Sequence, residues 1–208
     1  DHNWKNILIA FSVNPRQVQR IDALAGRVRL GVLLENAEAF QALAAVGSAS
    51  MDAWIKIDVG NHRTGLDWQD LPSIASLCEQ VKQNPRIRLA GLLTHSGHTY
   101  HAGGQEDVIN TFREGVTRLT AVRDGLQANG FSGLQISTGD TPGCSLCEDW
   151  SGIDEIRPGN FVFYDVQQAL AGSCSMDDVS MALACPVVAK HPERGEAVIY
   201  GGAVHLSK

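Results

Sequence analysis

The stretch ILIAFSVNPRQVQRIDALAG, residues 7–26, contains a complete strand–helix unit and decides the fold class. Residues 7–11 form a short, continuous apolar run, which is typical of a strand buried on both faces. Asn14 then supplies a helix N-cap, and a proline occupies the first helical position. Apolar residues repeat at helical spacing until Gly26, so the pattern predicts a helix that ends at this glycine.

The same unit recurs along the chain. Further strand-like runs lie at residues 28–34, 54–59, 89–94, 134–137 and 161–164, and helical patterns lie at 36–47, 71–81 and 108–130. Strands that alternate with helices predict a parallel sheet covered by helices, because each crossover returns on the same side with a right-handed turn. We therefore expect an α/β fold.

Beyond residue 164 the pattern becomes rich in β-formers. Two strand-like runs, at residues 184–188 and 197–200, flank a polar turn. They predict the first strands of a separate β domain.

Composition narrows the functional classes. The chain has 208 residues, 44% of them apolar and 19% charged, with a net charge of −6. An acidic chain without a run of cations argues against a nucleic-acid partner, and no apolar stretch reaches the roughly 20 residues that cross a bilayer. Five cysteines indicate reduced thiols, and the Cys144–Cys147 spacing is a weak signal for zinc. We expect a soluble cytoplasmic domain.

Polar residues gather just after the predicted strands. They occupy residues 60–65, 95–101 and 138–143, and residues 157–160 add another glycine beside an amide side chain. In a (β/α) barrel the site is built from these carboxyl-end loops. The small and hydroxyl residues at 137–143 and 159–160 predict loops that hold a phosphate, although tight turns alone explain the same composition equally well.

Charged residues and histidines in these loops allow several interpretations. Arg63 could face a phenolate or carboxylate, or could be an ordinary surface arginine. Alternation places Lys56 and Asp58 on one strand face, which favours a structural ion pair over a catalytic lysine. His95, His98 and His101 could bind zinc as in a metal-dependent hydrolase, or one of them could lie against an aromatic ligand.

Four ordered motifs carry a family resemblance. They are KIDVGNHRTG at 56–65, GLLTHSGHTY at 91–100, GDTPGCS at 139–145 and EIRPGNFVFYD at 155–165. Through them the chain resembles the D-serine dehydratase and D-threonine aldolase-like group, fold type III pyridoxal-phosphate enzymes of the alanine racemase fold. The D-serine dehydratase branch is the most similar.

The resemblance implies a domain organisation. It predicts a TIM barrel of the alanine-racemase type, incomplete at the N-terminus, over residues 1–180. Residues 181–208 would begin the C-terminal β domain.

The resemblance also implies cofactor contacts. Arg63 would lie near the phenolic oxygen, Tyr100 would be a neutral partner of the pyridine nitrogen, and His95 and Tyr164 would lie beside the ring. Thr141, Gly159 and Asn160 would hold the phosphate. The lysine that forms the Schiff base is expected upstream of Ile7, so no catalytic residue is assigned within these residues.

For the parent enzyme the resemblance implies a D-amino acid lyase that converts D-serine to pyruvate and ammonia, acts as a homodimer and possesses zinc near its C-terminus. Neither Cys185 nor His205 stands in a matching zinc motif. The segment alone is expected to be inactive. D-threonine aldolase, an amino acid racemase and a non-catalytic barrel that only binds the cofactor are the alternatives.

Overall fold

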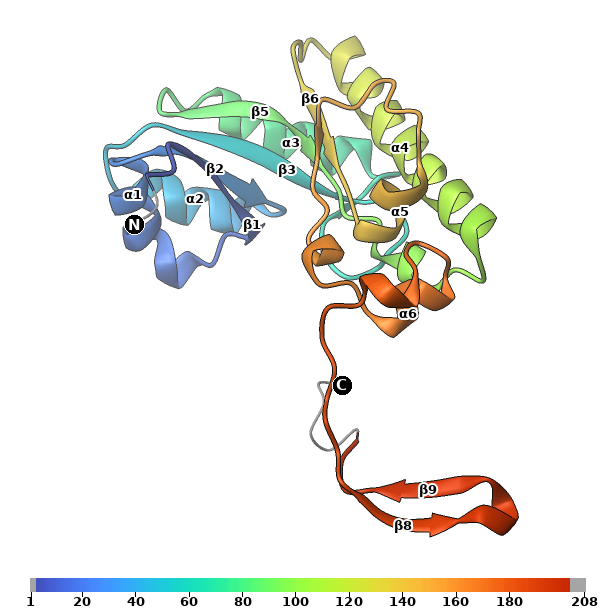
Figure 1. Ribbon diagram of the computed structural model, residues 1–208. Helices are drawn as coiled ribbons and strands as arrows, with labels where there is room; N and C mark the ends of the chain where they lie inside the picture. Colours follow the sequence, from blue (N-terminus) through green and yellow to red (C-terminus); the bar gives the residue numbers. More distant parts are fainter. Residues whose placement is uncertain (1–2, 203–208) are drawn as a thin grey trace.

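The structure, a computed structural model, describes residues 3–202. Its main body is a seven-stranded parallel sheet in the order β1-β2-β3-β5-β6-β7, with β4 beside β3, curled into a half-barrel (Figure 1). The strands are β1 Asn6–Ser12, β2 Arg29–Leu34, β3 Met51–Asp58, β4 Leu66–Asp67, β5 Ile87–Leu93, β6 Gln135–Thr138 and β7 Glu155–Ile156. The predicted α/β class and parallel sheet are confirmed.

Helices join successive strands. They are α1 Val18–Ala25, α2 Ala37–Ala45, α3 Leu71–Lys82, α4 Gln105–Ala128, α5 Thr141–Leu146 and α6 Val166–Leu170. Short 3-10 turns, η1 to η5, occupy Pro15–Gln17, Gly97–His101, Asn160–Val162, Met176–Asp178 and Pro192–Arg194. Within residues 3–202, no helix combines the length and apolar character required to span a membrane.

Side-chain caps place the first helices where the sequence predicts them. The Asn14 side chain accepts from the N–H of Arg16 at 3.0 Å, and Asn36 accepts from the N–H of Ala39 at 2.7 Å. Each cap satisfies an N–H group that has no partner inside its own helix. The chain therefore turns into each helix at a point set by local sequence.

The sheet has two different faces. The outer face packs against α1 to α4, and the main core forms there from side chains such as Val32, Ile55 and Leu119. The inner face holds a small second cluster of Leu33, Trp54, Ala90 and Leu93, with Leu8 packed against it. Alternation along the strands divides the two sets.

The apolar run at 161–164 is not a strand, so that prediction was wrong. Its first two residues lie in η3, and the N–H groups of Phe163 and Tyr164 both donate to the Asn160 carbonyl. The side chains of Phe161 and Phe163 are about half exposed, so the run lies outside the core. The sheet ends at β7, because Pro158 follows it closely and offers no N–H for continued pairing.

Strands β8 Val187–His191 and β9 Glu196–Ile199 pair antiparallel in a sheet of their own. Figure 1 shows this hairpin away from the half-barrel, at the end of an irregular segment. Gly195 forms its turn in the left-handed conformation. The domain boundary predicted at residues 180/181 precedes the hairpin and stays a prediction.

Candidate functional site

Four loops meet at the carboxyl edge of the half-barrel. They follow β3, β5, β6 and β7, at residues 59–65, 94–104, 139–140 and 157–159. Six of the seven residues assigned to the cofactor lie in these loops or in the short helical turns that follow them, and the seventh, Tyr164, lies between η3 and α6.

The loop after β3 is organised by one carboxylate. Asp58 Oδ1 accepts hydrogen bonds from the N–H groups of Gly60, Asn61 and His62 at 2.9, 2.9 and 3.1 Å. The loop also needs Gly65, whose φ is +111° and where a Cβ would lie 2.7 Å from backbone atoms of β3. The loop thereby places Arg63, with an exposed side chain, at the carboxyl edge of the half-barrel, which we call the rim.

Lys56 is buried at 6% exposure, and the ion pair expected between it and Asp58 is absent from the described residues, so that interpretation was wrong. The Asp58 carboxylate turns to the loop N–H groups and to His62 instead. Burial, reinforced by the charge of Arg63, lowers the pKa of Lys56 to about 8. The interior below the rim thus contains a lysine without a paired carboxylate.

His95 and Tyr100 are fixed relative to the loop after β6. The His95 Nδ1 lies 2.8 Å from the Gly139 carbonyl, which identifies Nδ1 as the donor and leaves Nε2 as an acceptor. Burial lowers the pKa of His95, and the charge of Arg63 acts in the same direction. The rings of His95 and Tyr100 lie 6.4 Å apart. His95 is therefore neutral at neutral pH.

Thr141 joins three of the predicted cofactor residues. Its N–H donates to the Tyr100 hydroxyl at 3.3 Å, and its own hydroxyl accepts from the N–H of Asn160 at 2.9 Å. Ser145 donates to the Thr141 carbonyl at 2.8 Å and lies 3.0 Å from the hydroxyl of Tyr164. Thr141 is also fully buried, so Tyr100 and Asn160 are the more accessible members of this network.

Gly159 and Arg63 stand apart from the Thr141 network. Gly159 is exposed, has φ −107° and has open space where a Cβ would be, so the structure does not require glycine there. Arg63 acts on its neighbours through its charge, since it lowers the pKa of both Lys56 and His95. The structure thus brings together five of the seven residues.

Asp140 is a residue of this site to which the sequence analysis assigned no role. Its Oδ1 accepts from the Thr99 hydroxyl and from the Gly143 N–H, both at 2.6 Å, and so ties the loop after β5 to α5. Burial raises the pKa of Asp140 to about 6. An aspartate directly before Thr-Pro is a helix N-cap signal, and that signal could have identified it.

Unpartnered buried polar atoms gather at this edge. Within the described residues they are Ser96 Oγ, His98 Nδ1, Thr138 Oγ1, Asp140 Oδ2, both amide atoms of Gln168, and Ser173 Oγ. All lie at the end of β6, in the loops after β5 and β6, or in and beside α6. Because buried polar groups are costly without partners, this edge is suited to polar ligand groups or water.

Metal ligands do not gather in the described part of the chain. No group of three or more His, Cys, Asp or Glu side chains there could hold a metal ion. The cysteines, including Cys144 and Cys147, are all free. His205 lies outside the described residues.

Comparison with known proteins agrees with this architecture. Residues 5–166 match the family model described as alanine racemase, N-terminal domain. The D-serine dehydratase of Dictyostelium discoideum is 28% identical over 98% of this chain and 55% of its own length. The D-threonine aldolase of Arthrobacter sp. is 25% identical over 74% of this chain and 41% of its own length.

A solved structure has the same fold. The D-threo-3-hydroxyaspartate dehydratase from Delftia sp. HT23 superposes with a TM-score of 0.81 and 26% identity, over 93% of this chain and 52% of that one. The chain spans about half the length of the curated relatives that it matches.

Proposed function

The chain belongs to the alanine racemase N-terminal domain family, and we propose that it forms the cofactor-binding half-barrel of a pyridoxal-phosphate-dependent D-amino acid lyase. The observation that carries the proposal is the network in which Thr141 joins Tyr100, Asn160 and, through Ser145, Tyr164. Dehydratases and an aldolase among the relatives support the lyase class.

The residues at the rim fit this cofactor. Unpartnered polar atoms gather there, and the positive charges of Arg63 and Lys56 favour an anionic ligand. When bound, pyridoxal phosphate supplies a ring that accepts electrons and stabilises negative charge at the substrate Cα. Arg63 would face its phenolic oxygen, while the exposed backbone of Gly159 and the half-buried Asn160 would face its phosphate.

Tyr100 and His95 would provide a hydrogen-bond donor and a proton acceptor beside the cofactor ring. The Tyr100 hydroxyl accepts from the Thr141 N–H and keeps its own hydrogen, so it can donate to an unprotonated ring nitrogen. His95 Nδ1 donates to the Gly139 carbonyl, which leaves Nε2 free to accept a proton or to lie against the ring. Tyr164, fixed by Ser145, would close the same side.

Within the lyase class we propose the dehydratase reaction on D-serine, which gives pyruvate and ammonia. The Dictyostelium discoideum D-serine dehydratase, 28% identical over 98% of this chain, supports this choice over the Arthrobacter aldolase, which is 25% identical over 74%. D-threonine separates the two reactions, because a dehydratase yields 2-oxobutanoate and an aldolase yields glycine and acetaldehyde. The assay uses the longest natural polypeptide that contains this chain, and glycine as the product would contradict dehydration.

Borohydride reduction with pyridoxal phosphate tests the cofactor assignment directly. Reduction fixes the cofactor on any lysine to which it is bonded, and peptide mass mapping identifies that lysine. We expect this chain to bind the cofactor without stoichiometric labelling of Lys56, because the anchoring lysine is proposed to lie in another segment of the enzyme. Stoichiometric labelling of Lys56 would overturn that proposal, and absence of cofactor binding would overturn the site.

We also propose a homodimer. Large apolar side chains of η3 and α6, such as Phe161, Phe163 and Leu170, are 49, 51 and 81% exposed, as expected of a surface that meets a partner. Sedimentation equilibrium of the full-length enzyme checks this proposal, and a monomer at micromolar concentration contradicts it.

A further inference from the structure

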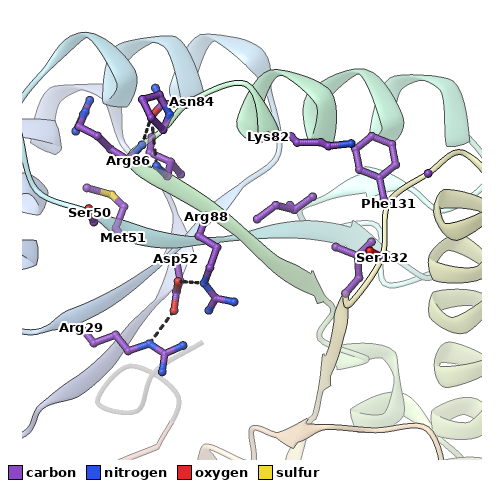
Figure 2. A pocket seen from close by; sticks show the side chains of 15 residues that line it. Arg29, Ser50, Met51, Asp52, Lys82, Asn84, Arg86, Arg88, Phe131 and Ser132 are labelled. Carbon is purple, nitrogen blue, oxygen red and sulfur yellow. Dashed lines mark hydrogen bonds and ion pairs between the residues drawn. The ribbon is translucent and has the colours of Figure 1, made fainter.

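The amino ends of the strands carry a cavity that the proposed lyase site does not use. It measures about 870 Å³ and lies between the starts of β2, β3 and β5 and the segment that precedes β6. Figure 2 shows its lining side chains. Parallel strands place this cavity at the edge opposite to the cofactor loops, about 20 Å away for a strand of six or seven residues.

Cations dominate the cavity wall. Arg29, Lys82, Arg86 and Arg88 line it against a single carboxylate, Asp52. This is a local excess of three positive charges in a chain whose net charge is −6. Such an excess attracts anions, and the attraction is strongest where low-dielectric walls surround the charges.

One carboxylate holds two of the guanidinium groups. Asp52 Oδ1 accepts from Arg88 Nε at 2.7 Å and Oδ2 accepts from Arg29 Nε at 2.9 Å, from the strands on either side of β3. Figure 2 shows both arginines reaching this carboxylate. Although burial opposes it, these hydrogen bonds hold the pKa of Asp52 below its usual range. Asp52 therefore stays ionised and fixes both guanidinium groups, and we call these three side chains, Arg29, Asp52 and Arg88, the clamp.

The clamp leaves the terminal nitrogens of both guanidinium groups available. Only the Nε atoms of Arg29 and Arg88 bond to Asp52, and neither guanidinium group has a second hydrogen-bond partner in the described residues. Arg86 is different, because its terminal nitrogens donate to the carbonyls of Ala44 and Ala49. Arg86 is thus committed to holding the chain, whereas the other two retain free donor edges.

The remaining wall suits a small organic anion. The Lys82 ammonium lies 5.1 Å from the centre of the Phe131 ring and has no ion pair in the described residues. Ser50 and Ser132 offer hydroxyl groups, and Met51, Leu89 and Leu134 supply apolar surface. Lys82 lies on the helix side of the sheet, whereas Arg29, Asp52 and Arg88 share the inner face, where the two guanidinium groups leave an excess of 2 − 1 = 1 positive charge over the carboxylate.

We propose that this cavity binds a small phosphate-bearing anion, held by the free guanidinium edges of Arg29 and Arg88. Arginine forks held in place match the oxygens of phosphate well, because the ordering cost is already met by the clamp. The site stands independently of the lyase proposal, since none of its residues belongs to the cofactor loops.

Inorganic phosphate is the probe, titrated at low salt and pH 7.5 into the ¹⁵N-labelled chain while amide shifts are followed by NMR. The shifts locate the bound anion. We expect saturable changes at residues 28–30, 51–53 and 87–89, separate from any changes at residues 139–141 and 159–160. Changes confined to the cofactor loops would overturn the proposal.

Two matched variants test the contacts. The Arg88 side chain is 55% exposed, so Arg88→Gln should fold normally and weaken phosphate binding at the amino-end cavity about tenfold, as expected for one lost charged contact. Arg16→Gln removes the same charge from an exposed position outside the cavity and should leave binding within about twofold. Equal weakening by both would show attraction by net charge alone and would overturn the site.

Discussion

The two edges of the half-barrel use their carboxylates in opposite ways. At the carboxyl edge, Asp58 and Asp140 accept hydrogen bonds from backbone N–H groups and shape the loops around them. At the amino edge, Asp52 accepts from two arginine side chains instead. The carboxylates at the carboxyl edge fix the backbone of the loops, whereas the carboxylate at the amino edge fixes the positions of two charged side chains.

The difference explains where each edge is rigid and where it is accessible. Asp140 is 1% exposed and its second oxygen is unpartnered, so the loops that it joins are fixed at an electrostatic cost. The side chains of Arg29 and Arg88 are 64 and 55% exposed. A substitution that disturbs the loop backbone at the carboxyl edge should therefore destabilise the chain more than loss of the Asp52 ion pairs at the amino edge.

The largest effect is expected at Gly65. Gly65→Ala must combine a φ of +111° with a Cβ 2.7 Å from the backbone of β3, so it should reduce the free energy of unfolding by about 3 kcal/mol or more. Gly133→Ala is the matched control, because Gly133 also has positive φ, +70°, but open space around its Cβ position; it should cost about 1 kcal/mol. Urea denaturation measures both, and equal losses would contradict a steric role for Gly65.

The next largest effect is a pH-dependent gain in folding stability when Asp140 is replaced by asparagine. Burial raises the pKa of Asp140 to about 6, above the unfolded value near 3.8, so the folded state binds more protons between these values. Stability contributed by this group should therefore fall as pH rises from about 4 to about 6. The total difference is up to about 3 kcal/mol.

Asp140→Asn removes this titration and keeps an oxygen that can accept from Thr99 and Gly143. Relative to the wild type, the variant should be similar in stability at pH 4.5 and clearly more stable at pH 7.5. Asp124→Asn, at an exposed position on α4, is the control and should show no such change. If the stability of Asp140→Asn relative to the wild type stayed constant or fell between pH 4.5 and pH 7.5, the raised pKa of Asp140 would be contradicted.

A smaller effect is expected at the amino edge. Asp52→Asn leaves Arg29 and Arg88 without a carboxylate, but exposure of both arginines limits the loss to about 1 kcal/mol. Because the pKa of Asp52 is lowered, its stabilising contribution should disappear as pH falls through the folded-state pKa. Thermal denaturation at low and high salt checks the assignment, since 1 M salt should shrink the difference between variant and wild type.

The repeating strand–helix units could be predicted from the sequence because their signals are local. Asn14, Asn36 and the glycine after α1 mark helix ends within a few residues, and the outer face of each strand reads as apolar. Three of the four cofactor loops could be placed for the same reason, since each follows a strand that the sequence predicts; the fourth follows β7, a strand of two residues that was not predicted. Local signals thus locate the rim.

Pairing within the rim could not be read in this way. Alternation places Lys56 and Asp58 on the same face of β3. The Asp58 carboxylate nevertheless accepts hydrogen bonds from the N–H groups of the following loop and does not pair with Lys56. The run at 161–164 is apolar and aromatic, but whether it pairs depends on the sheet edge at β7. Which partner a side chain or a strand finally takes depends on groups that the local sequence pattern does not contain.

The smallest effect is expected for the hydroxyl of Tyr164, which tests whether the carboxyl-edge network is held cooperatively. Tyr164→Phe removes its hydrogen bond with Ser145, at 3.0 Å in a half-exposed setting, and should cost about 0.5–1 kcal/mol. Ser145→Ala should cost somewhat more, because Ser145 also donates to the Thr141 carbonyl. A double-mutant cycle measured by urea denaturation isolates the pair, and we expect a coupling energy of about 0.5 kcal/mol. Strict additivity would mean that Tyr164 is held by its backbone, at φ +49°, rather than by its hydroxyl.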